Sequence, residues 1–261
     1  MAFIHRHKTP ELWIPGLTPP ASSMLSVNWS HPLSRGLVSY VLPAHTQIDL
    51  AGGPSFSNET GIRGIGPLGI EYSGSRDTGL SALTSAQRIT TSGSLFWFGR
   101  VNGALGSYAN IFGSAWSNPV TPPYNCFQMG THLSGATLRL GWNNNGTQGD
   151  TQDLSGIGIA FSRSLALTFD GVNCLFYRNG SYGSTVATAI SIGYTATSYL
   201  IVGTPTNLST TVAAMWNRTL SNDEIAQLDR DPFTILVPNR RPLRNSRLLQ
   251  AYQKSIQFVI S

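Results

Sequence analysis

The chain has 261 residues, of which 41% are hydrophobic and only 11% are charged. This length suits one large domain with a sizeable core, and the composition excludes intrinsic disorder, which requires low hydrophobicity and high net charge. Of the 17 basic residues five lie in residues 238–261, which hold no acid, leaving 12 basic against 12 acidic residues in a neutral body. A basic body would have indicated a nucleic-acid partner, and this neutral body gives no such indication, so we expect no nucleic-acid partner. The sequence contains no run of about 20 apolar residues, the length that a membrane-spanning helix needs, so we expect no membrane partner either.

Residues 1–30 are predicted to form an extended N-terminal arm. Four prolines lie between residues 10 and 20, and proline at this density prevents both helices and interior strands. Trp13 lies among these prolines and is predicted to dock the arm on the domain or on a neighbouring subunit. The basic residues near Met1 are not followed by an apolar run with a cleavage site, so we expect a protein made and kept in a cytoplasm.

The middle of the chain contains short strand candidates rich in β-branched and aromatic residues, many with a period of two. The candidates are Gly36–Leu42, Leu68–Ser73, Ser94–Val101, Asn110–Ala115, Asn125–Met129, Thr137–Trp142, Ile157–Phe169, Asn173–Arg178, Ser184–Ile190, Tyr199–Val202 and Thr211–Asn217. The dipeptides Asp170-Gly171 and Asn179-Gly180 bracket one candidate, as hairpin turns that require positive φ would. Many short strands without intervening amphipathic helices predict an all-β, two-sheet antiparallel sandwich over residues 31–237.

One helix is predicted near the C-terminal end of this domain. Ser221 and Glu224 have the spacing of a capping box, and Leu220 and Ile225 are placed for the hydrophobic staple across it. The helix should end near Asp231, because the following proline disfavours helical backbone at that residue. We expect its apolar face to cap an open end of the sandwich.

Beyond the helix, Phe233–Val237 is predicted to form one more strand, and residues 238–261 a basic C-terminal arm. The charge of this arm comes mainly from Arg240, Arg241, Arg244 and Arg247. It fits an anchoring arm or a solvated tail. In Ser255–Ile260 the apolar residues alternate around Phe258, and a terminal strand of this kind can add to the exposed sheet edge of another subunit.

No catalytic constellation is evident, so we expect a non-enzymatic protein. The glutamates are isolated in sequence, whereas most glycoside hydrolases need two carboxyl groups flanking one bond. Asp150 and Asp153 lie close together, but in a Gly/Asn/Gln-rich stretch that favours a solvated loop. The run Gly61–Gly69 lacks the lysine and the following helix of a phosphate-binding loop, which favours turn glycines. Cys126 and Cys174 have no metal-ligand spacing and are predicted to be buried free thiols.

No cofactor is predicted, and two ligands are considered. Calcium prefers oxygen ligands, and Asp150, Asp153 and Asp170 are the candidates, although none belongs to a recognisable ligand series. For a glycan the candidates are aromatic and amide side chains, because aromatic rings stack on sugars and amides both donate and accept hydrogen bonds. These are Trp116, Tyr124, Trp142, Asn143 and Asn144. The competing interpretation is that the tryptophans fill the core and the asparagines form a turn.

Three segments resemble those of a known family. They are the entry stretch His31–Val38, the hairpin from Leu165 to Gly180 with its Tyr-x-Asn-Gly ending, and the closing stretch Ala213–Leu228. They resemble the concanavalin A-like, laminin-G-like jelly-roll domains over about residues 31–237, especially those encoded by tailed bacteriophages and prophages. The stretch from Asp231 to Pro242 is also similar to the C-terminal ends of phage members. The resemblance implies a two-sheet jelly roll.

Members of this family include lectins, glucan hydrolases and virion proteins, so the resemblance is more specific for fold than for function. Together with the arms and the neutral body, it leads us to predict a bacteriophage virion structural protein, such as a capsid decoration, head-fibre or tail-associated component. The chain would be made in the host bacterial cytoplasm and located in the virion. Its partners would be capsid or tail proteins and further copies of itself, bound through Trp13, the four arginines and Phe258. The alternative is a carbohydrate-binding, lectin-like module that adsorbs to a host-surface glycan.

Overall fold

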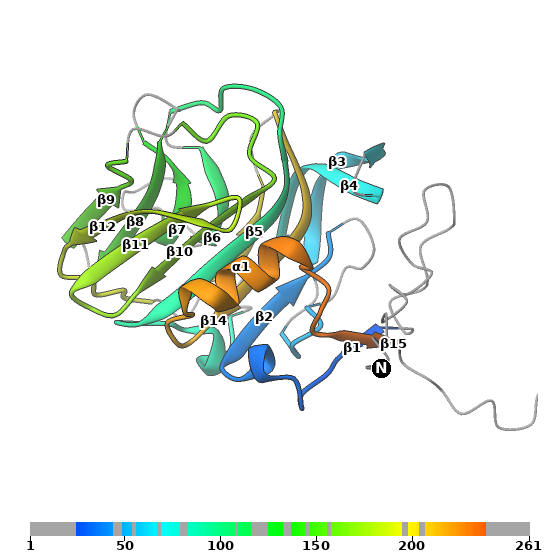
Figure 1. Cartoon of the computed structure of the whole chain (residues 1–261), viewed down its shortest axis with the longest axis horizontal. Helices are drawn as coiled ribbons and strands as arrows, with labels where there is room; N and C mark the ends of the chain where they lie inside the picture. Colours follow the sequence, from blue (N-terminus) through cyan, green and yellow to red (C-terminus); the bar gives the residue numbers. More distant parts are fainter. Residues whose placement is uncertain are drawn as a thin grey trace, which may run out of the picture.

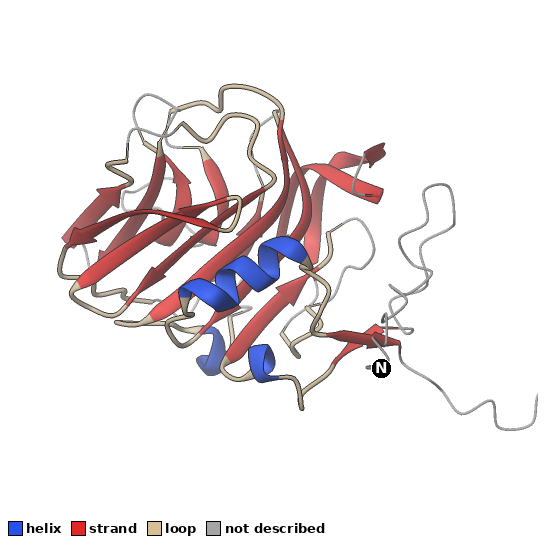
Figure 2. Cartoon of the chain, viewed as in Figure 1, coloured by secondary structure: helices blue, strands red, loops and turns tan. Residues whose placement is uncertain are grey.

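The computed structural model describes residues 25–43, 49–53, 56–66, 69–78, 83–107, 109–115, 125–132, 137–144, 147–155, 158–194, 198–203 and 207–238. These residues form mainly β-strands, with one α-helix and short 3-10 helices (Figures 1 and 2). The strands are β1 (Leu25–Val27), β2 (Leu37–Val41), β3 (Phe56–Gly66), β4 (Gly69–Thr78), β5 (Gly93–Val101), β6 (Asn110–Ala115), β7 (Asn125–Thr131), β8 (Leu138–Asn144), β9 (Thr147–Gln152), β10 (Ser164–Phe169), β11 (Asn173–Arg178), β12 (Ser181–Ala187), β13 (Tyr199–Val202), β14 (Leu208–Trp216) and β15 (Leu236–Pro238). The helices are η3 (Pro32–Ser34), η4 (Ser85–Gln87) and α1 (Asn222–Arg230). None of the described helices has the length and apolar character needed to cross a membrane.

Within the described residues, every strand except β1 and β15 belongs to one antiparallel sheet that is folded over into two layers (Figure 1). Its order is β12-β11-β10-β5-β14-β4-β13-β6-β7-β8-β9, with β2 beside β14 and β3 beside β4. The sheet turns over at β14 and β4, which share one register pair, Thr210 with Tyr72. The front layer contains β12, β11, β10, β5, β14 and β2, and the back layer contains β13 and β6 to β9. The predicted all-β, two-sheet antiparallel sandwich is confirmed.

The first core lies between the two layers. Strand β5 shows how it forms, because its side chains alternate between the two faces of the front layer. Leu95 and Trp97 belong to the core between the layers, whereas Phe96 and Phe98 belong to a different cluster on the outer face. The indole Nε1 of Trp97 donates to Thr210 Oγ1 at 2.9 Å, so the polar end of this large buried side chain is satisfied.

The second core lies between the outer face of the front layer and α1. Ile225 and Leu228 of the helix pack in the same cluster as Phe96 and Trp216, and Figure 1 shows α1 lying across the front layer. Our expectation that the helix caps an open end of the sandwich is therefore wrong. The physical reason is that the alternate side chains of β5 and β14 leave a second apolar face, which only a covering element removes from water.

The predicted ends of the helix are confirmed. The hydroxyl of Ser221 accepts the N–H of Glu224 at 3.3 Å, and the carboxylate of Glu224 accepts the N–H of Ser221 at 2.8 Å, which completes the capping box. Asp231 is the C-cap residue. Leu220 is buried in the second core beside Ile225, as the hydrophobic staple requires.

The strand predictions are confirmed for most elements, but β1, which lies in the predicted N-terminal arm, and two strands of the large sheet were not predicted. Strand β3 contains most of the run Gly61–Gly69, which we interpreted as turn glycines, and it pairs with β4 in a hairpin. Strand β9 contains Asp150, which we placed in a solvated loop, and it pairs with β8. Both sequences are rich in glycine or polar residues, so their strand character comes from backbone pairing with a neighbour and not from side-chain propensity.

Two predicted strands are shorter than expected. The candidate Ile157–Phe169 is a strand only from Ser164, and the candidate Phe233–Val237 is a strand only from Leu236. In both cases a turn precedes the strand, closed by the N–H of Ser162 bonding to the carbonyl of Ile159 at 3.2 Å and by the N–H of Leu236 bonding to the carbonyl of Phe233 at 2.8 Å.

The strands β1 and β15 form a separate antiparallel ladder, in which Leu25 is opposite Pro238 and Val27 is opposite Leu236. Leu25 and Val27 are buried in the second core, so this part of the segment 1–30 packs with the folded domain. Residues 1–24 of the predicted N-terminal arm, and the basic arm beyond Pro238, lie outside the described residues.

Candidate functional site

The two end strands of the folded sheet, β9 and β12, come together at one side of the sandwich (Figure 1). The contact is made by side chains and by the segment that follows β9. The N–H of Leu154 donates to Ser184 Oγ at 3.0 Å, and Ser184 Oγ donates to Asp153 Oδ1 at 2.5 Å. We call this junction between the end strands, formed by Asp153, Leu154, Ser184 and Val186, the seam.

Asp153 holds the seam together from the inside. It is 7% exposed and also accepts the N–H of Ser155 at 3.0 Å and the hydroxyl of Ser155 at 2.8 Å. Gly183 of β12 permits this close approach, because a Cβ there would lie 3.2 Å from Asp153 Oδ2. These hydrogen bonds satisfy the buried carboxylate, which gives Asp153 a structural role.

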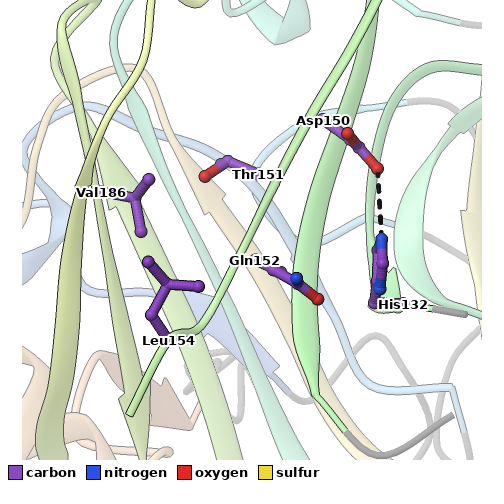
Figure 3. Close-up of a pocket in the computed structure, with 6 residues that line it drawn as sticks. All are labelled: His132, Asp150, Thr151, Gln152, Leu154 and Val186. Carbon is purple, nitrogen blue, oxygen red and sulfur yellow. Dashed lines mark ion pairs between the residues drawn. The ribbon is translucent and has the colours of Figure 1, made fainter. Parts of the chain in front are cut away.

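A pocket of about 190 Å³ opens at the seam. Its lining residues are His132, Asp150, Thr151, Gln152, Leu154 and Val186 (Figure 3). In Figure 3, Asp150 is directed toward His132, whereas the side chain of Thr151 is directed toward Val186. Because successive side chains of a strand point to opposite faces, the pocket has one polar side and one largely apolar side, separated by the edge strand β9.

Asp150 is the centre of the polar side. Its Oδ2 accepts a hydrogen bond from Arg139 Nε at 3.0 Å and lies 3.8 Å from His132 Nε2. The side chain of Asp150 is 44% exposed, and that of Arg139 is 15% exposed. Gly141 lets the guanidinium lie flat across β8, because a Cβ there would be 2.7 Å from Arg139 Nη2. The polar side therefore presents a carboxylate whose orientation is held by a partly buried arginine.

Leu154 and Val186 form the apolar side. Leu154 is 66% exposed, which is unusual for a large aliphatic side chain. Val186 is partly buried and packs against the first core. The side chain of Thr151 is directed to this side and is 6% exposed. The pocket thus combines an exposed apolar wall on one side of β9 with hydrogen-bonding groups on the other side.

Three of the predicted glycan-binding residues lie at the end of β8, which pairs with β9. The indole of Trp142 packs against the first core and lies over Gly149 of β9, where a Cβ would be 2.5 Å from the ring. Asn143 is 1% exposed. Asn144 Nδ2 donates to Ser191 Oγ at 2.9 Å. Trp142 therefore fills space at the edge of the core, as in the competing interpretation.

The structure does not describe the other predicted binding and anchoring residues. Trp116 and Tyr124, and the predicted anchoring residues Trp13, Arg240, Arg241, Arg244, Arg247 and Phe258, lie outside the described residues. The site at the seam was missed because β9 was not predicted. The available signal was the alternation of Gln148, Asp150 and Gln152 in the sequence, which has the period of a strand with one polar face.

The aspartates considered for calcium have other partners. Asp150 pairs with Arg139, and Asp153 accepts hydrogen bonds from serine groups. Asp170 accepts the N–H groups of Val172 and Asn173 at 3.0 and 2.8 Å, and these bonds lower the pKa of its carboxyl. Within the part of the chain that the structure describes, no group of three or more His, Cys, Asp or Glu side chains could hold a metal ion.

Cys174 is a free, fully buried thiol, as predicted. Burial raises its pKa, which disfavours the thiolate that a nucleophile needs. This cysteine is a core residue that packs between the two layers.

Comparison with known proteins gives matches of structure only. No family model matches the chain, and no curated protein matches it. Domain 4 of an extracellular GH43 arabinanase from Geobacillus stearothermophilus, solved with arabinotriose, is similar with a TM-score of 0.52 and 12% identity, covering 74% of this chain and 98% of that domain. The binding domain of Paraclostridial Mosquitocidal Protein 1 has a TM-score of 0.53 and 13% identity, covering 77% of this chain and 53% of the other.

A sialidase from Trypanosoma rangeli, solved with 2,3-difluorosialic acid, is similar with a TM-score of 0.53 and 14% identity, covering 77% of this chain. The match covers 34% of the sialidase chain, so this protein spans about a third of that enzyme and about half of the mosquitocidal binding domain. At these identities the likeness shows the fold alone. The chain is a β-sandwich domain of the architecture found in these carbohydrate-associated and binding proteins.

Proposed function

We propose that this chain is a non-catalytic, carbohydrate-binding β-sandwich module, and that the pocket at the seam is its binding site. The observation that carries the proposal is the arrangement around β9. Asp150 with Arg139 lies on one face of this edge strand, and the exposed Leu154 with Val186 lies on the other. A sugar ring presents the same combination, since it has hydroxyl groups around its rim and apolar C–H groups on its faces.

The polar side suits hydroxyl recognition. A carboxylate accepts hydrogen bonds from hydroxyl groups, and a guanidinium or an amide donates to their oxygens. Asp150 and Gln152 project from the same face of β9, because they are two residues apart. Each exposed polar group therefore has a geometry set by the sheet, which reduces the side-chain entropy lost on binding.

The structural relatives support this class of function. The similar arabinanase domain was solved with a bound trisaccharide, and this chain covers nearly all of that domain. The similar mosquitocidal domain is described as a binding domain. A glycan partner for this chain is our inference from these likenesses together with the pocket.

A non-catalytic role is supported by what the described carboxylates do. Glycoside hydrolysis uses two carboxyl groups on either side of the scissile bond. Asp153 is buried and engaged with serine groups, Glu224 caps a helix, and Asp229 of α1 bonds to Arg163 and Ser164. Asp150 is the exposed carboxylate at the pocket, which suits binding by one acid without a catalytic partner.

The test of this proposal is a glycan array followed by calorimetry with the best-binding oligosaccharide. Asp150→Asn should weaken binding roughly tenfold to a hundredfold, because it removes a charged hydrogen-bond acceptor. Asp170→Asn is the matched control, since Asp170 is an exposed turn residue that does not line the pocket and should leave binding unchanged. An array without any bound glycan, or equal affinity of the Asp150→Asn variant, would show that the pocket is not a glycan site.

The prediction of a bacteriophage virion protein remains a second candidate, compatible with glycan binding. One observation favours attachment through the arms: the ladder of β1 with β15 places Leu25 opposite Pro238, so both arms join the domain side by side. Arms that leave from one place can bind one partner together, and their effects on affinity then multiply. Incorporation of a chain lacking residues 238–261 into purified particles, compared with the full chain, tests this role.

A further inference from the structure

The side chain of Thr151 is an unusual feature of the seam. It is 6% exposed, and its Oγ1 has no hydrogen-bond partner among the described residues. A buried hydroxyl without a partner is costly, because it has lost its hydrogen bonds to water. Thr151 lines the pocket, and Figure 3 shows its hydroxyl directed to the side where Leu154 and Val186 lie. Thr151 therefore lines the pocket with a hydroxyl oxygen that is unpaired and shielded from solvent.

We propose that Thr151 is a specificity-determining residue that hydrogen-bonds a hydroxyl of a neutral sugar at the end of a glycan chain, inserted between Leu154 and Val186. This inference rests on the proposed function and adds two details: the bound sugar is neutral, and it enters the pocket as far as Thr151. A threonine hydroxyl both donates and accepts, so it matches a sugar hydroxyl in either orientation.

The size of the pocket points to a chain end. Pockets for drug-sized ligands have volumes of about 300–1,000 Å³, whereas this one has about 190 Å³. It accommodates a single terminal sugar ring, with the rest of the glycan outside the pocket along β9. The hydroxyl oxygen of Thr151 is shielded from solvent, and Leu154, which is 66% exposed, is the wall that can turn aside to admit the ring.

The charge of the pocket points to a neutral sugar. Asp150 places a carboxylate at the entrance on the other face of β9, and this carboxylate already has Arg139 as its partner. An acidic sugar would bring a second negative group close to Asp150, and like charges at short range repel. Neutral oligosaccharides avoid this repulsion and use the carboxylate as an acceptor.

Thr151→Val tests the proposal, because valine has nearly the same shape and lacks the hydroxyl. We expect affinity for the neutral oligosaccharide selected on the array to fall roughly three- to tenfold. The melting temperature should stay the same or rise, because the variant removes an unpaired buried hydroxyl. Thr151→Ser keeps the hydroxyl and should keep most of the affinity.

Thr211→Val is the matched control. Thr211 of β14 is fully buried and its Oγ1 also lacks a partner among the described residues, but it does not line the pocket. This variant should change stability in the same direction and leave glycan affinity unchanged. Equal affinity of Thr151→Val and the wild type, or stronger binding of sialylated than of neutral chains, overturns this inference while leaving the proposed function in place. A wild type that binds no glycan overturns both.

Discussion

Phe161 has a backbone conformation that large side chains rarely adopt. Its φ is +61°, and its side chain is 78% exposed. The turn that contains it is closed by the N–H of Ser162 bonding to the carbonyl of Ile159 at 3.2 Å. Arg178 holds the same turn, donating to the Ala160 carbonyl and to Ser162 Oγ, both at 2.8 Å. The turn is therefore imposed by its surroundings, and Phe161 accepts a strained conformation with little packing in return.

Replacing this residue by glycine should stabilise the protein. Glycine adopts positive φ without steric cost, so we expect Phe161→Gly to raise the free energy of unfolding by about 1 kcal/mol. Urea denaturation followed by circular dichroism measures the change. Asn179→Gly is the comparison, because Asn179 has a φ of +50° but accepts the N–H of Arg163 through its side chain. That variant should show no gain, and a destabilised Phe161→Gly would mean that the aromatic ring makes contacts worth more than the strain.

At the residue level, the sequence predicts best where the signal is local. The turns at Asp170-Gly171 and Asn179-Gly180 are present, with φ of +94° at Gly171 and +74° at Gly180, because turn chemistry depends on a few adjacent residues. The ion pair of Asp150 with Arg139 was not predicted. It joins residues 11 positions apart, and it exists only because β8 and β9 pair in one register.

Among the elements, α1 is the one that the sequence describes most completely. Its N-terminal end carries an ion pair that the capping box alone does not require, because Arg218 donates from Nη1 to Glu224 Oε2 at 2.8 Å and from Nη2 to Oε1 at 2.6 Å. Hydrogen bonding from Arg218 lowers the pKa of Glu224 below its ordinary value of 4.5. Glu224 thus caps the helix and ties the loop before it to the helix.

This pair predicts a pH-dependent contribution to stability. A carboxyl group with a lowered pKa stabilises the folded state above its unfolded pKa, and this stabilisation is lost as the pH falls through the lower folded pKa. Glu224→Gln keeps the capping hydrogen bond but removes the ion pair. It should lower the free energy of unfolding at pH 7 by about 0.5 kcal/mol, in the range for partly exposed pairs.

The difference between wild type and Glu224→Gln should therefore shrink as the pH is lowered from 5 to below the folded pKa of Glu224. Urea unfolding curves of both proteins at several pH values provide the measurement. A difference that stayed constant with pH would show that the effect of the substitution is steric and does not come from the charge.

The strands β3 and β9 show why elements can escape prediction. Helix signals such as caps depend on the chain itself, whereas a strand takes its hydrogen bonds from a neighbour. Gly61, Gly64 and Gly66 lie in β3 although glycine has low strand propensity, and they are opposite Gly74, Glu71 and Gly69 in the register with β4. The hairpin, as a unit, determines the conformation of both sequences.

At the scale of the whole molecule, the front layer joins two cores. Its inner face packs on the back layer and its outer face packs on α1, through alternate residues of the same strands. Loss of either core exposes one face of this shared layer. We therefore expect one cooperative unfolding transition for the described domain, which calorimetry can verify.

The seam and the second core lie at different parts of the sandwich, so stability and binding should separate. Ile225→Ala removes a buried side chain of the second core and should lower the free energy of unfolding by about 3 kcal/mol, with unchanged glycan affinity below the melting transition. Leu154→Ala should have the opposite pattern. The free energy of unfolding should change by no more than about 0.5 kcal/mol, because the position is exposed, whereas the affinity for the glycan should change. Denaturant unfolding and calorimetric titration of both variants measure the two effects. Parallel losses in stability and affinity would show that the seam depends on the second core.

The sequence by itself determined the all-β class, the helix with both of its ends, and the hairpin turns around β11. These features depend on periodicity and on side chains that act on backbone a few positions away. Only the tertiary structure decided that α1 covers a sheet face and that β9 meets β12. The pocket brings His132 of the back layer near Val186 of the front layer, and this proximity arises from the folding over of a sheet whose end strands are distant in sequence. Burial of apolar area drives that closure, and it depends on the sum of many contacts and not on any local pattern.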